Sequence, residues 1–197
     1  MVEAIVLAAG ASSRFGAPKL LASAAGRPVV RWTVEHALAS RASAVHVVLG
    51  GAGEGVRAAL AGLPVRFVES ARWREGLSAS LAAGVRAASA GASGVVVLLG
   101  DQPTVRAPMI DAVIDAFEGA EASIVAATYR GERGHPVLFA AALFPELLAT
   151  SGDRGAREVV ARDPARVRLV EMGCAMPRDV DTAGDLADVA IHLARGE

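Results

Sequence analysis

The segment Leu7–Lys19 (LAAGASSRFGAPK) carries residue types suited to binding phosphate. Its small residues let backbone N–H groups approach phosphate oxygens closely, and Ser12 and Ser13 add hydroxyl donors. Arg14 and Lys19 supply two cations for a triphosphate. The glycines have the wrong spacing for a Walker loop or a dinucleotide fingerprint. The segment therefore predicts a phosphate-binding loop of another kind, the alternative being an ordinary connection between a strand and a helix.

Lysine usage makes one of these cations stand out. Of the 20 basic residues in the chain, 19 are arginine, and Lys19 is the one lysine. Arginine presents a wide planar fork, whereas lysine presents a compact ammonium. A single lysine inside a Gly/Ser-rich loop therefore indicates a chemical need for that compact cation, with chance retention as the alternative.

A second polar cluster, Gly-Asp-Gln-Pro at Gly100–Pro103, follows the strongly apolar run Gly94–Leu99. In an open parallel sheet, ligands bind beyond the carboxyl ends of the strands. A carboxylate there suits Mg²⁺, which takes one or two carboxylates together with substrate phosphates. We therefore predict that Asp101 is a metal ligand. The alternative is an aspartate that merely closes a turn.

Two further polar clusters lie later in the chain. Asp179–Asp185 (DVDTAGD) precedes the last predicted helix, and Thr182 or Asp185 can cap that helix. We expect only one of Asp179 and Asp181 to face the ligand, and we favour Asp181 as a second metal ligand. The cluster Arg133–Pro136 contains Gly-His-Pro just before a predicted strand, and both a structural and a chemical role are open for its histidine.

Hydrophobic patterns predict the elements that position these clusters. Strands are expected at Val2–Ala8, Ala44–Leu49, Val65–Val68, Gly94–Leu99, Ser123–Ala127, Pro136–Phe139 and Val167–Val170. Helices are expected at Pro28–Ala39, Gly55–Leu60, Leu77–Ser89, Pro108–Phe117, Ala141–Leu148, Arg154–Arg162 and Ala183–Ala194. Strands and helices alternate through the first 120 residues or so, which indicates an α/β fold: a mostly parallel, twisted, Rossmann-like sheet with helices on both faces. After about residue 128 a small antiparallel insertion is expected. The glycine-rich stretch Gly50–Gly55 is interpreted as a turn, because a dinucleotide loop would require glycine where Val56 stands.

Composition restricts the class of protein. The chain has 197 residues, of which 53% are hydrophobic and 21% charged, so we expect a single domain over residues 1–197. The net charge is −1 and no basic stripe is present, which argues against nucleic-acid and membrane-surface partners. The one cysteine, Cys174, excludes an internal disulfide. Without a signal peptide or a membrane-spanning run, the expected location is the cytoplasm.

Taken together, the motifs resemble the MobA-like nucleotidyltransferases, and within them the molybdenum cofactor cytidylyltransferase branch. LAAGASSRFGAPK, GDQP, GHP and DVDTAGDL occur in the family's order over essentially the whole chain. The pair Ala8-Ala9 resembles the cytidylyl form of the loop, and Trp73–Leu81 resembles the segment that lines the base and sugar. Two departures are Ser70-Ala71 in place of Asn-Pro and Ala183-Gly184 in place of Pro-Glu, neither of which removes a charged catalytic group.

The resemblance implies a nucleotide-diphospho-sugar transferase-like fold and a Mg²⁺-dependent transfer of a nucleoside monophosphate. CTP is favoured over GTP, the acceptor is a phosphorylated pterin of the molybdopterin type, and a molybdenum hydroxylase or its chaperone is the implied protein partner. The implied catalytic residues are Arg14, Lys19 and Asp101, with Asp101 and Asp181 as metal ligands. The implied nucleotide-binding residues are Leu7, Ala8, Ala9, Gly10, Ser12, Ser13, Gly76, Ser78, Ser80 and Gly100. The implied acceptor-binding residues are Gln102, His135 and Arg157, the last in a segment, Gly152–Arg157, that resembles the substrate side of the family.

Three alternatives differ in kind. The first is a cytidylyltransferase for another small phosphorylated acceptor, such as methylerythritol phosphate or a sugar phosphate. The second is a non-catalytic protein that binds and delivers molybdenum cofactor. The third is an oxidoreductase that uses the pocket for a flavin or nicotinamide, against which the failed glycine fingerprint counts.

Overall fold

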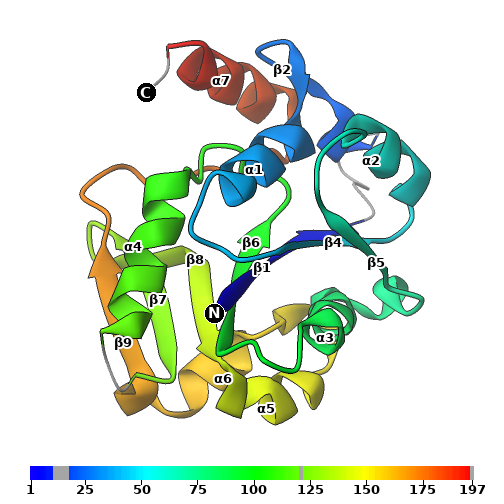
Figure 1. Ribbon diagram of the computed structural model, residues 1–197. Helices are drawn as coiled ribbons and strands as arrows, with labels where there is room; N and C mark the ends of the chain where they lie inside the picture. The colour runs from blue at the N-terminus through cyan, green and yellow to red at the C-terminus, as the bar shows by residue number, and fades with distance from the viewer. Residues whose placement is uncertain (11–17, 120–121, 196–197) are drawn as a thin grey trace.

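The computed structural model describes residues 1–10, 18–119 and 122–195, and Ser12, Ser13 and Arg14 lie outside this part. Within it, four parallel strands form one half of a seven-stranded sheet (Figure 1). Strand β1 is central in this half, and pairs with β4 on one side and β6 on the other. The four strands are β1 (Val2–Ala8), β4 (Val45–Leu49), β5 (Arg66–Glu69) and β6 (Gly94–Leu99). Because they are parallel, their carboxyl ends meet at one edge of the sheet.

The second half of the sheet contains one antiparallel strand. The strand order is β5-β4-β1-β6-β8-β7-β9, with β7 at Ile124–Tyr129, β8 at Glu132–Ala140 and β9 at Val167–Glu171. Strand β8 runs antiparallel to both β6 and β7, and β7 is parallel to β9. The expected antiparallel insertion after about residue 128 is therefore a hairpin whose returning strand lies inside the sheet, between β6 and β7.

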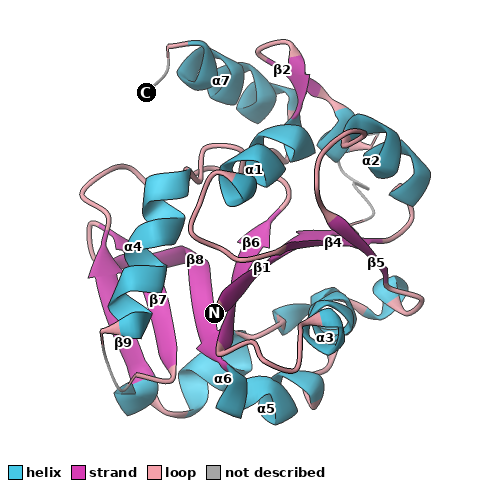
Figure 2. Ribbon diagram, in the orientation of Figure 1, coloured by secondary structure: helices cyan, strands magenta, loops and turns pink. Residues whose placement is uncertain are grey.

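Helices cover both faces of the sheet (Figure 2). Side chains of β1 alternate between the faces: Ala4 and Val6 join one buried cluster, and Ile5 and Leu7 join the other. The first cluster is closed by α1 (Val29–Leu38), α2 (Gly53–Ala59) and α4 (Ala107–Glu118). The second is closed by α3 (Leu77–Ala87), α5 (Phe144–Leu148) and α6 (Arg157–Arg162). Burial on both faces explains why the strands are almost continuously apolar.

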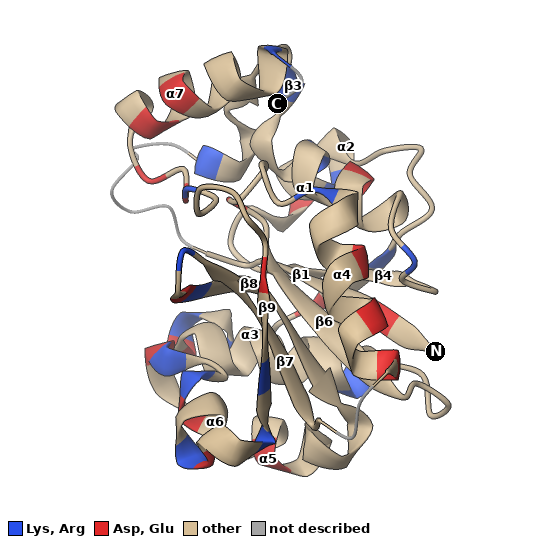
Figure 3. Ribbon diagram, turned by 90° about the vertical axis from the view of Figure 1, so that its left-hand side faces the viewer, with Lys and Arg blue, Asp and Glu red and all other residues tan. Residues whose placement is uncertain are grey.

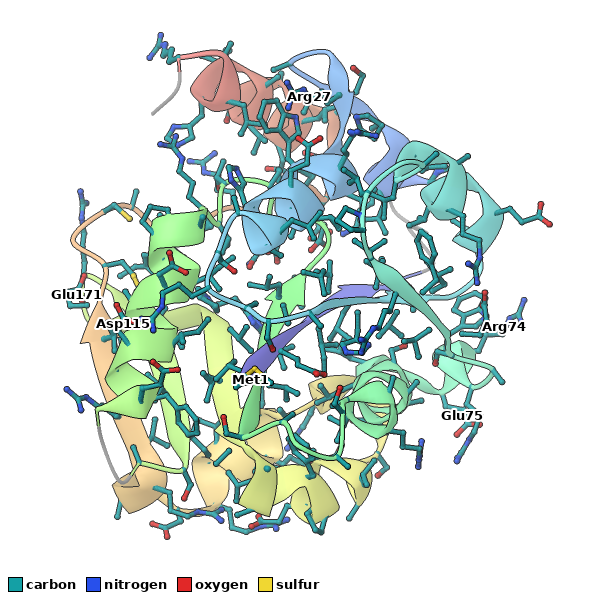
Figure 4. All side chains as sticks on the ribbon, viewed as in Figure 1. Met1, Arg27, Arg74, Glu75, Asp115 and Glu171 are labelled. Carbon is teal, nitrogen blue, oxygen red and sulfur yellow. The ribbon has the colours of Figure 1, made fainter. Side chains whose placement is uncertain are left out.

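A third, smaller cluster lies away from the sheet, where the C-terminal helix α7 (Ala183–Ala194) packs on a two-stranded hairpin. The hairpin pairs β2 (Ser23–Ala24) with β3 (Arg27–Pro28). Arg27, labelled in Figure 4, has its guanidinium 4.8 Å from the centre of the Trp32 ring, and its Nη1 is 2.7 Å from Glu35 Oε2 on α1. These contacts attach the hairpin to α1, so that α7 and α1 are held by one small core.

The predicted elements are mostly confirmed, and the exceptions have identifiable reasons. The bounds of β1, β6 and α7 agree with the prediction. Strand β8 begins at Glu132, so Arg133–Pro136 lies inside the strand rather than before it. Pro136 is tolerated there because the pairing with β7 is interrupted between Arg133 and Val137. The predicted helix at 141–148 is a 3₁₀ turn followed by α5, and the one at 154–162 begins only at Arg157. The described 3₁₀ turns are η1 (Lys19–Leu21), η2 (Trp73–Glu75), η3 (Ala141–Leu143), η4 (Gly152–Arg154) and η5 (Pro164–Arg166).

Charge is distributed without a dominant sign. Basic and acidic residues are mixed over the elements visible in Figure 3, in keeping with the net charge of −1. Among the described residues, the helices are too short or too polar to cross a bilayer.

One charged side chain, Glu3, lies inside the sheet and predicts a pH dependence. Its Oε2 lies 2.8 Å from Nε2 of His46 on β4 and accepts a hydrogen bond from the Ser89 backbone N–H. Burial raises the pKa of Glu3, but the hydrogen bonds from Ser89 and His46 outweigh burial and hold the pKa below its ordinary value. A carboxylate with a depressed pKa stabilises the fold above its unfolded pKa of about 4.3, and this contribution is lost as the pH falls through the lower folded value.

We therefore expect Glu3→Gln to lower the free energy of unfolding by about 1.5–3 kcal/mol at neutral pH. The difference from wild type should shrink in acid, since the wild-type carboxylate becomes protonated there. Urea unfolding of both proteins at neutral pH and at a pH below 4 measures this. A difference that is constant over the two conditions would show that Glu3 does not act through its charge.

Candidate functional site

Lys19 lies between two carboxylates at the carboxyl edge of the sheet. Its Nζ is 2.6 Å from Oδ2 of Asp101 and 2.7 Å from Oδ1 of Asp181. The lysine side chain is 14% exposed, that of Asp101 19% and that of Asp181 36%, so the three charges are half-buried to buried. Contacts of this length between ions are charge-assisted hydrogen bonds. The structure thus brings together three of the residues that the sequence predicted for catalysis and metal binding.

The lysine is positioned by the short turn η1. Leu20, the next residue, is buried in the core cluster beneath α1 and α2 and anchors the turn. The backbone N–H of Leu21 donates to the carbonyl of Pro18, and that of Ala22 donates to the carbonyl of Lys19. A buried leucine beside the lysine therefore directs the ammonium toward the sheet edge.

Asp101 is positioned by the end of β6. The N–H of Gly100 donates to the carbonyl oxygen of Leu7 on β1 at 3.0 Å, and a Cβ at position 100 would lie 3.0 Å from the same oxygen. Glycine therefore lets the two strand ends approach closely. The N–H of Gln102 then donates a hydrogen bond to the carbonyl of Leu99, which closes a turn after the strand. The carboxylate of Asp101 is consequently held on a rigid turn directly after a central strand.

Asp181 and Asp179 lie on the irregular segment between β9 and α7. The N–H of Val180 donates to the backbone carbonyl of Asp101 at 3.0 Å, and the Val180 side chain is fully buried in the core beneath α7. Of the two aspartates on either side of Val180, Asp179 accepts a hydrogen bond from Gln102 in the loop after β6. Asp181 is linked to the same loop through Lys19, which pairs with both Asp181 and Asp101. The prediction that only one of Asp179 and Asp181 faces the site is wrong, because residues two apart in an extended segment lie on the same side.

Gln102 is paired with this additional carboxylate. Its Nε2 donates to Oδ1 of Asp179 at 2.6 Å, and the glutamine is 7% exposed. Burial raises the pKa of Asp179, the hydrogen bond from Gln102 lowers it, and the charges of Asp101 and Asp181 raise it, with a net increase. Burial works to lower the pKa of Lys19, but the attraction of Asp101 and Asp181 outweighs burial and raises it. Lys19 is therefore a permanent cation at neutral pH.

The helix after this segment has the cap that the sequence predicted. Thr182 Oγ1 accepts from the backbone N–H of Asp185, and Asp185 Oδ2 accepts from that of Thr182. This reciprocal pair is a capping box, which fixes where α7 begins. Asp185 is thereby assigned a structural role, and Asp181 is left directed at Lys19.

His135 lies on β8, behind the same loop. Its Nδ1 donates to the carbonyl of Val97 on β6 at 3.2 Å, and its own carbonyl accepts from the hydroxyl of Tyr129 at 2.5 Å. Burial lowers the pKa of His135, and the charge of Arg157 lowers it further. These effects outweigh the hydrogen bond to Val97 and the charges of Asp179 and Asp101, which raise the pKa. The ring is therefore neutral at physiological pH and within electrostatic reach of the carboxylate cluster.

The segment predicted to line the nucleotide begins α3. Gly76 has φ of 108°, and a Cβ there would lie 2.6 Å from the carbonyl carbon of Gly152, so this glycine is required by its close contact with η4. Ser78 and Ser80 are buried, and the Ser78 hydroxyl has no hydrogen-bond partner among the described residues. Contact of these serines with a nucleotide stays a prediction.

Gly50 is a residue of the site that sequence reasoning missed. It follows β4, and a Cβ there would lie 2.5 Å from the carbonyl oxygen and 2.9 Å from Cα of Ala9. Where the chain leaves β1, the backbone of Ala9 therefore packs directly against the backbone of Gly50. Its signal in the sequence was a glycine placed directly after a buried strand, which we interpreted only as part of a turn.

Gly50→Ala is expected to displace the backbone of Ala9, with a loss of about 1–3 kcal/mol in stability from overpacking. Nucleotide affinity should fall with it, because the same backbone opens the predicted phosphate loop. Gly91→Ala is the matched control, since a Cβ at Gly91 meets nothing within 4 Å. Thermal melting and nucleotide titration compare the two variants, and equal behaviour would contradict the close packing at Gly50.

A hollow of about 620 Å³ lies between the N-terminal end of α4, residues 174–178 and α7. Its walls include Met109, Met176 and Ile191, and arginines such as Arg106 and Arg178 border it. Lys19, Asp101 and Asp181 are not among the described residues that line it. The charged cluster at the sheet edge is thus separate from this hollow.

An α/β sheet with a lysine held between two aspartates at its carboxyl edge is suited to binding phosphates and a divalent metal. Residues 4–167 match the model of the MobA-like NTP transferase domain, and the chain belongs to this family. The fold and the resemblance predicted from the sequence are thereby confirmed.

Individual relatives differ in what they share with the chain. The nicotine blue oxidoreductase of Paenarthrobacter nicotinovorans is 32% identical over 189 residues, which cover 92% of each chain. The bifunctional protein GlmU of Anaeromyxobacter sp. (strain K) is 35% identical over 178 residues, which cover 81% of this chain but 36% of GlmU. The crystal structure of Rv0371c in complex with manganese, from Mycobacterium tuberculosis H37Rv, has a TM-score of 0.82 at 31% identity and covers 96% of this chain and 98% of its own. A related protein of the same fold thus binds a divalent metal.

Proposed function

We propose that the chain transfers CMP from CTP to a phosphate-bearing acceptor of the molybdopterin type, with release of pyrophosphate. The observation that carries this proposal is the placement of Lys19 between Asp101 and Asp181 at the sheet edge. The carboxylates of the two aspartates both point at the Lys19 ammonium, at 2.6 and 2.7 Å, and two carboxylates that converge in this way are a suitable ligand pair for Mg²⁺. Two carboxylates suffice for such a site, because Mg²⁺ keeps waters and substrate phosphates as its other ligands. The choice of CTP rests on the resemblance of Ala8-Ala9 to the cytidylyl form of the loop.

In this mechanism the protein works by positioning and by charge. The acceptor phosphate is already ionised, so a strong general base is not needed, and in-line placement of the reacting groups supplies much of the rate. When bound, Mg²⁺ would neutralise charge on the triphosphate. Lys19 and Arg14 would neutralise charge at the α-phosphate and the departing pyrophosphate, and the amides of Ala9 and Gly10 would act as fixed dipoles.

The remaining predicted residues divide between the two substrates. Gly76, Ser78 and Ser80 are proposed to contact the base and ribose at the start of α3. Gln102, His135 and Arg157 are proposed to face the acceptor, on the ground of the family resemblance and because Gln102 directly follows Asp101 in the chain. A molybdenum hydroxylase or its chaperone would then receive the product.

Pyrophosphate release with CTP, GTP, ATP and UTP tests this function. Each nucleotide is incubated with Mg²⁺ and a crude pterin acceptor, and in parallel with methylerythritol phosphate and a sugar phosphate. We expect release with CTP and the pterin acceptor. Release with CTP only in the presence of methylerythritol phosphate or the sugar phosphate would show that the acceptor is not a pterin. Tight pterin binding without turnover would favour a delivery protein.

A second candidate is an oxidoreductase, because the relative that matches the chain over 92% of both lengths is a nicotine blue oxidoreductase. This reading requires a bound flavin or nicotinamide. The visible absorbance spectrum of the purified protein tests for a flavin, and turnover of a nicotinamide in the absence of nucleoside triphosphate tests for the other cofactor.

A further inference from the structure

We propose that Arg130 and Arg133, at the tip of the β7–β8 hairpin, bind the phosphate group of the acceptor together with Arg157 on α6. This inference rests on the proposed function, because it names the groups that hold the second substrate. The sequence motifs gave no role to either arginine of the tip. The ligand class is a phosphate monoester, which carries about 1.5–2 negative charges at neutral pH.

The register of the sheet places the hairpin tip beyond the end of the β6–β8 pairing. The last pair between these two strands is Val97 with Val137. Strand β8 continues to pair with β7 as far as Tyr129 and Glu132. The end of the hairpin therefore separates from β6 and projects at the carboxyl edge, where Asp101 follows β6. Figure 3 shows this tip with its basic residues in blue.

One carboxylate, that of Glu171 at the end of β9, fixes the backbone of the tip. It accepts hydrogen bonds from the N–H groups of Arg130 at 2.9 Å and Gly131 at 3.2 Å. The hydrogen bond from Arg130, with those from Gly131, Gly173 and Thr128, outweighs burial and holds the pKa of Glu171 below its ordinary value. Arg130 has φ of 53°, a left-handed conformation that persists in a non-glycine residue when surrounding contacts impose it. Glu171 thus holds the tip through backbone donors rather than through an ion pair with an arginine.

The guanidinium groups at this edge have no carboxylate partner among the described residues. Arginines on several other surfaces are paired with Asp or Glu. Arg130, Arg133 and Arg157 are exposed, and none of them forms an ion pair within the part of the chain that the structure describes. Glu132 lies next to Arg133, but neighbouring side chains of a strand point to opposite faces. The three cations are therefore available to an external anion.

His135 connects these arginines with the loop after β6. It lies two residues after Arg133 on β8, and its Nδ1 contacts the carbonyl of Val97 near the end of β6. The charges of Arg157 and Asp101 both act on its ring. An acceptor phosphate held by the arginines would therefore lie at the end of the sheet at which the nucleotide is proposed to bind.

Phosphate is the anion that this arrangement fits. A guanidinium presents parallel N–H donors that match two oxygens of a phosphate, and the resulting hydrogen bonds are charge-assisted. A phosphate monoester has oxygens for more than one guanidinium, and its charge requires more than one cation. Binding by a backbone-fixed tip would also orient the acceptor for in-line attack.

Binding of inorganic phosphate in the absence of nucleotide tests the proposal. Phosphate is titrated by calorimetry into the wild-type protein and into the variants Arg130→Gln, Arg133→Gln and Arg157→Gln. We expect each variant to bind phosphate about tenfold more weakly, the size expected for one hydrogen bond between charged groups. Arg133→Lys should recover part of the affinity, because it keeps the charge without the planar fork.

Arg86→Gln is the matched control. Arg86 is an exposed arginine on α3 that likewise forms no ion pair with another described residue, so its substitution gives the same change in net charge. It should bind phosphate as wild type does, and phosphate bound by the predicted loop Leu7–Lys19 is common to all these proteins. Thermal melting establishes that each variant is folded. The proposal is overturned if wild type binds no phosphate, if the three variants keep its affinity, or if Arg86→Gln loses as much.

Failure of this inference and failure of the proposed function give different results. If the hairpin variants lose phosphate affinity and wild type transfers no CMP, the anion site holds and the function is wrong. If wild type transfers CMP, we expect Arg133→Gln to raise KM for the acceptor about tenfold and to leave KM for CTP unchanged. Transfer by wild type with an unchanged acceptor KM in the variants would refute the arginine site and leave the function standing.

Discussion

Lys19→Ala is expected to lower pyrophosphate release from CTP by about a thousandfold, equivalent to about 4 kcal/mol of transition-state stabilisation. The lysine is a cation with a raised pKa, held within 2.7 Å of two aspartates at the sheet edge, where the triphosphate is proposed to bind. Because the charge that Lys19 neutralises grows as pyrophosphate leaves, the loss should appear mainly in kcat. A coupled assay for pyrophosphate at saturating and limiting CTP measures it.

Two further variants make this result specific. Lys19→Arg keeps the charge but widens the head group, and it should recover little activity since a planar fork does not fit between carboxylates placed around one nitrogen. Arg41→Ala removes an exposed cation and should leave turnover unchanged. Thermal melting establishes that each variant is folded. Near-wild-type turnover of a folded Lys19→Ala protein would refute the proposed mechanism.

Asp101→Asn is expected to have a loss of similar size, about a hundred- to a thousandfold. The substitution keeps the size of the side chain and removes its charge, so it weakens the metal ligand without emptying the turn after β6. The dependence of the rate on Mg²⁺ concentration should shift to higher concentrations or disappear. Titration of the rate with Mg²⁺ at fixed CTP measures both effects.

Asp188→Asn is the matched control for this prediction. Asp188 is 63% exposed and pairs with Arg178 on the surface, so its loss should not change the Mg²⁺ dependence. Asp181→Asn should act in the same direction as Asp101→Asn. An Asp101→Asn enzyme with normal rate and normal Mg²⁺ dependence would remove Asp101 from the metal site.

Local patterns predicted much of the fold because they reflect burial. The run Gly94–Leu99 is apolar throughout since both faces of β6 are covered, and its bounds were predicted correctly. The two-residue strands β2 and β3 were missed, because they are too short to produce a period and are held by packing against α1 and α7. The start of β8 was missed since Gly134 and Pro136 are poor strand residues that the neighbouring strands tolerate.

The candidate site was predicted in part, where local features of the sequence identified a residue. Asp101 could be selected because it directly follows a buried parallel strand, and Lys19 because the chain has no second lysine. Asp179 was rejected by an incorrect reading of side-chain alternation, and the structure places it against Gln102. The role of Gly50 depends on the backbone of Ala9, which lies on a different strand and leaves no local pattern.

The sequence by itself determined the inventory of this site: one compact ammonium, carboxylates after a central strand and before the last helix, and an α/β frame to carry them. Only the tertiary structure decided that these charges meet. Lys19 and Asp181 are 162 residues apart in the chain, yet Nζ of the lysine lies 2.7 Å from Oδ1 of the aspartate. The order of the strands and the hydrogen bond from the Val180 N–H to the Asp101 carbonyl bring them together. Contacts over such separations depend on how the sheet assembles, because local periodicity reports which face of an element is buried and not which elements become neighbours.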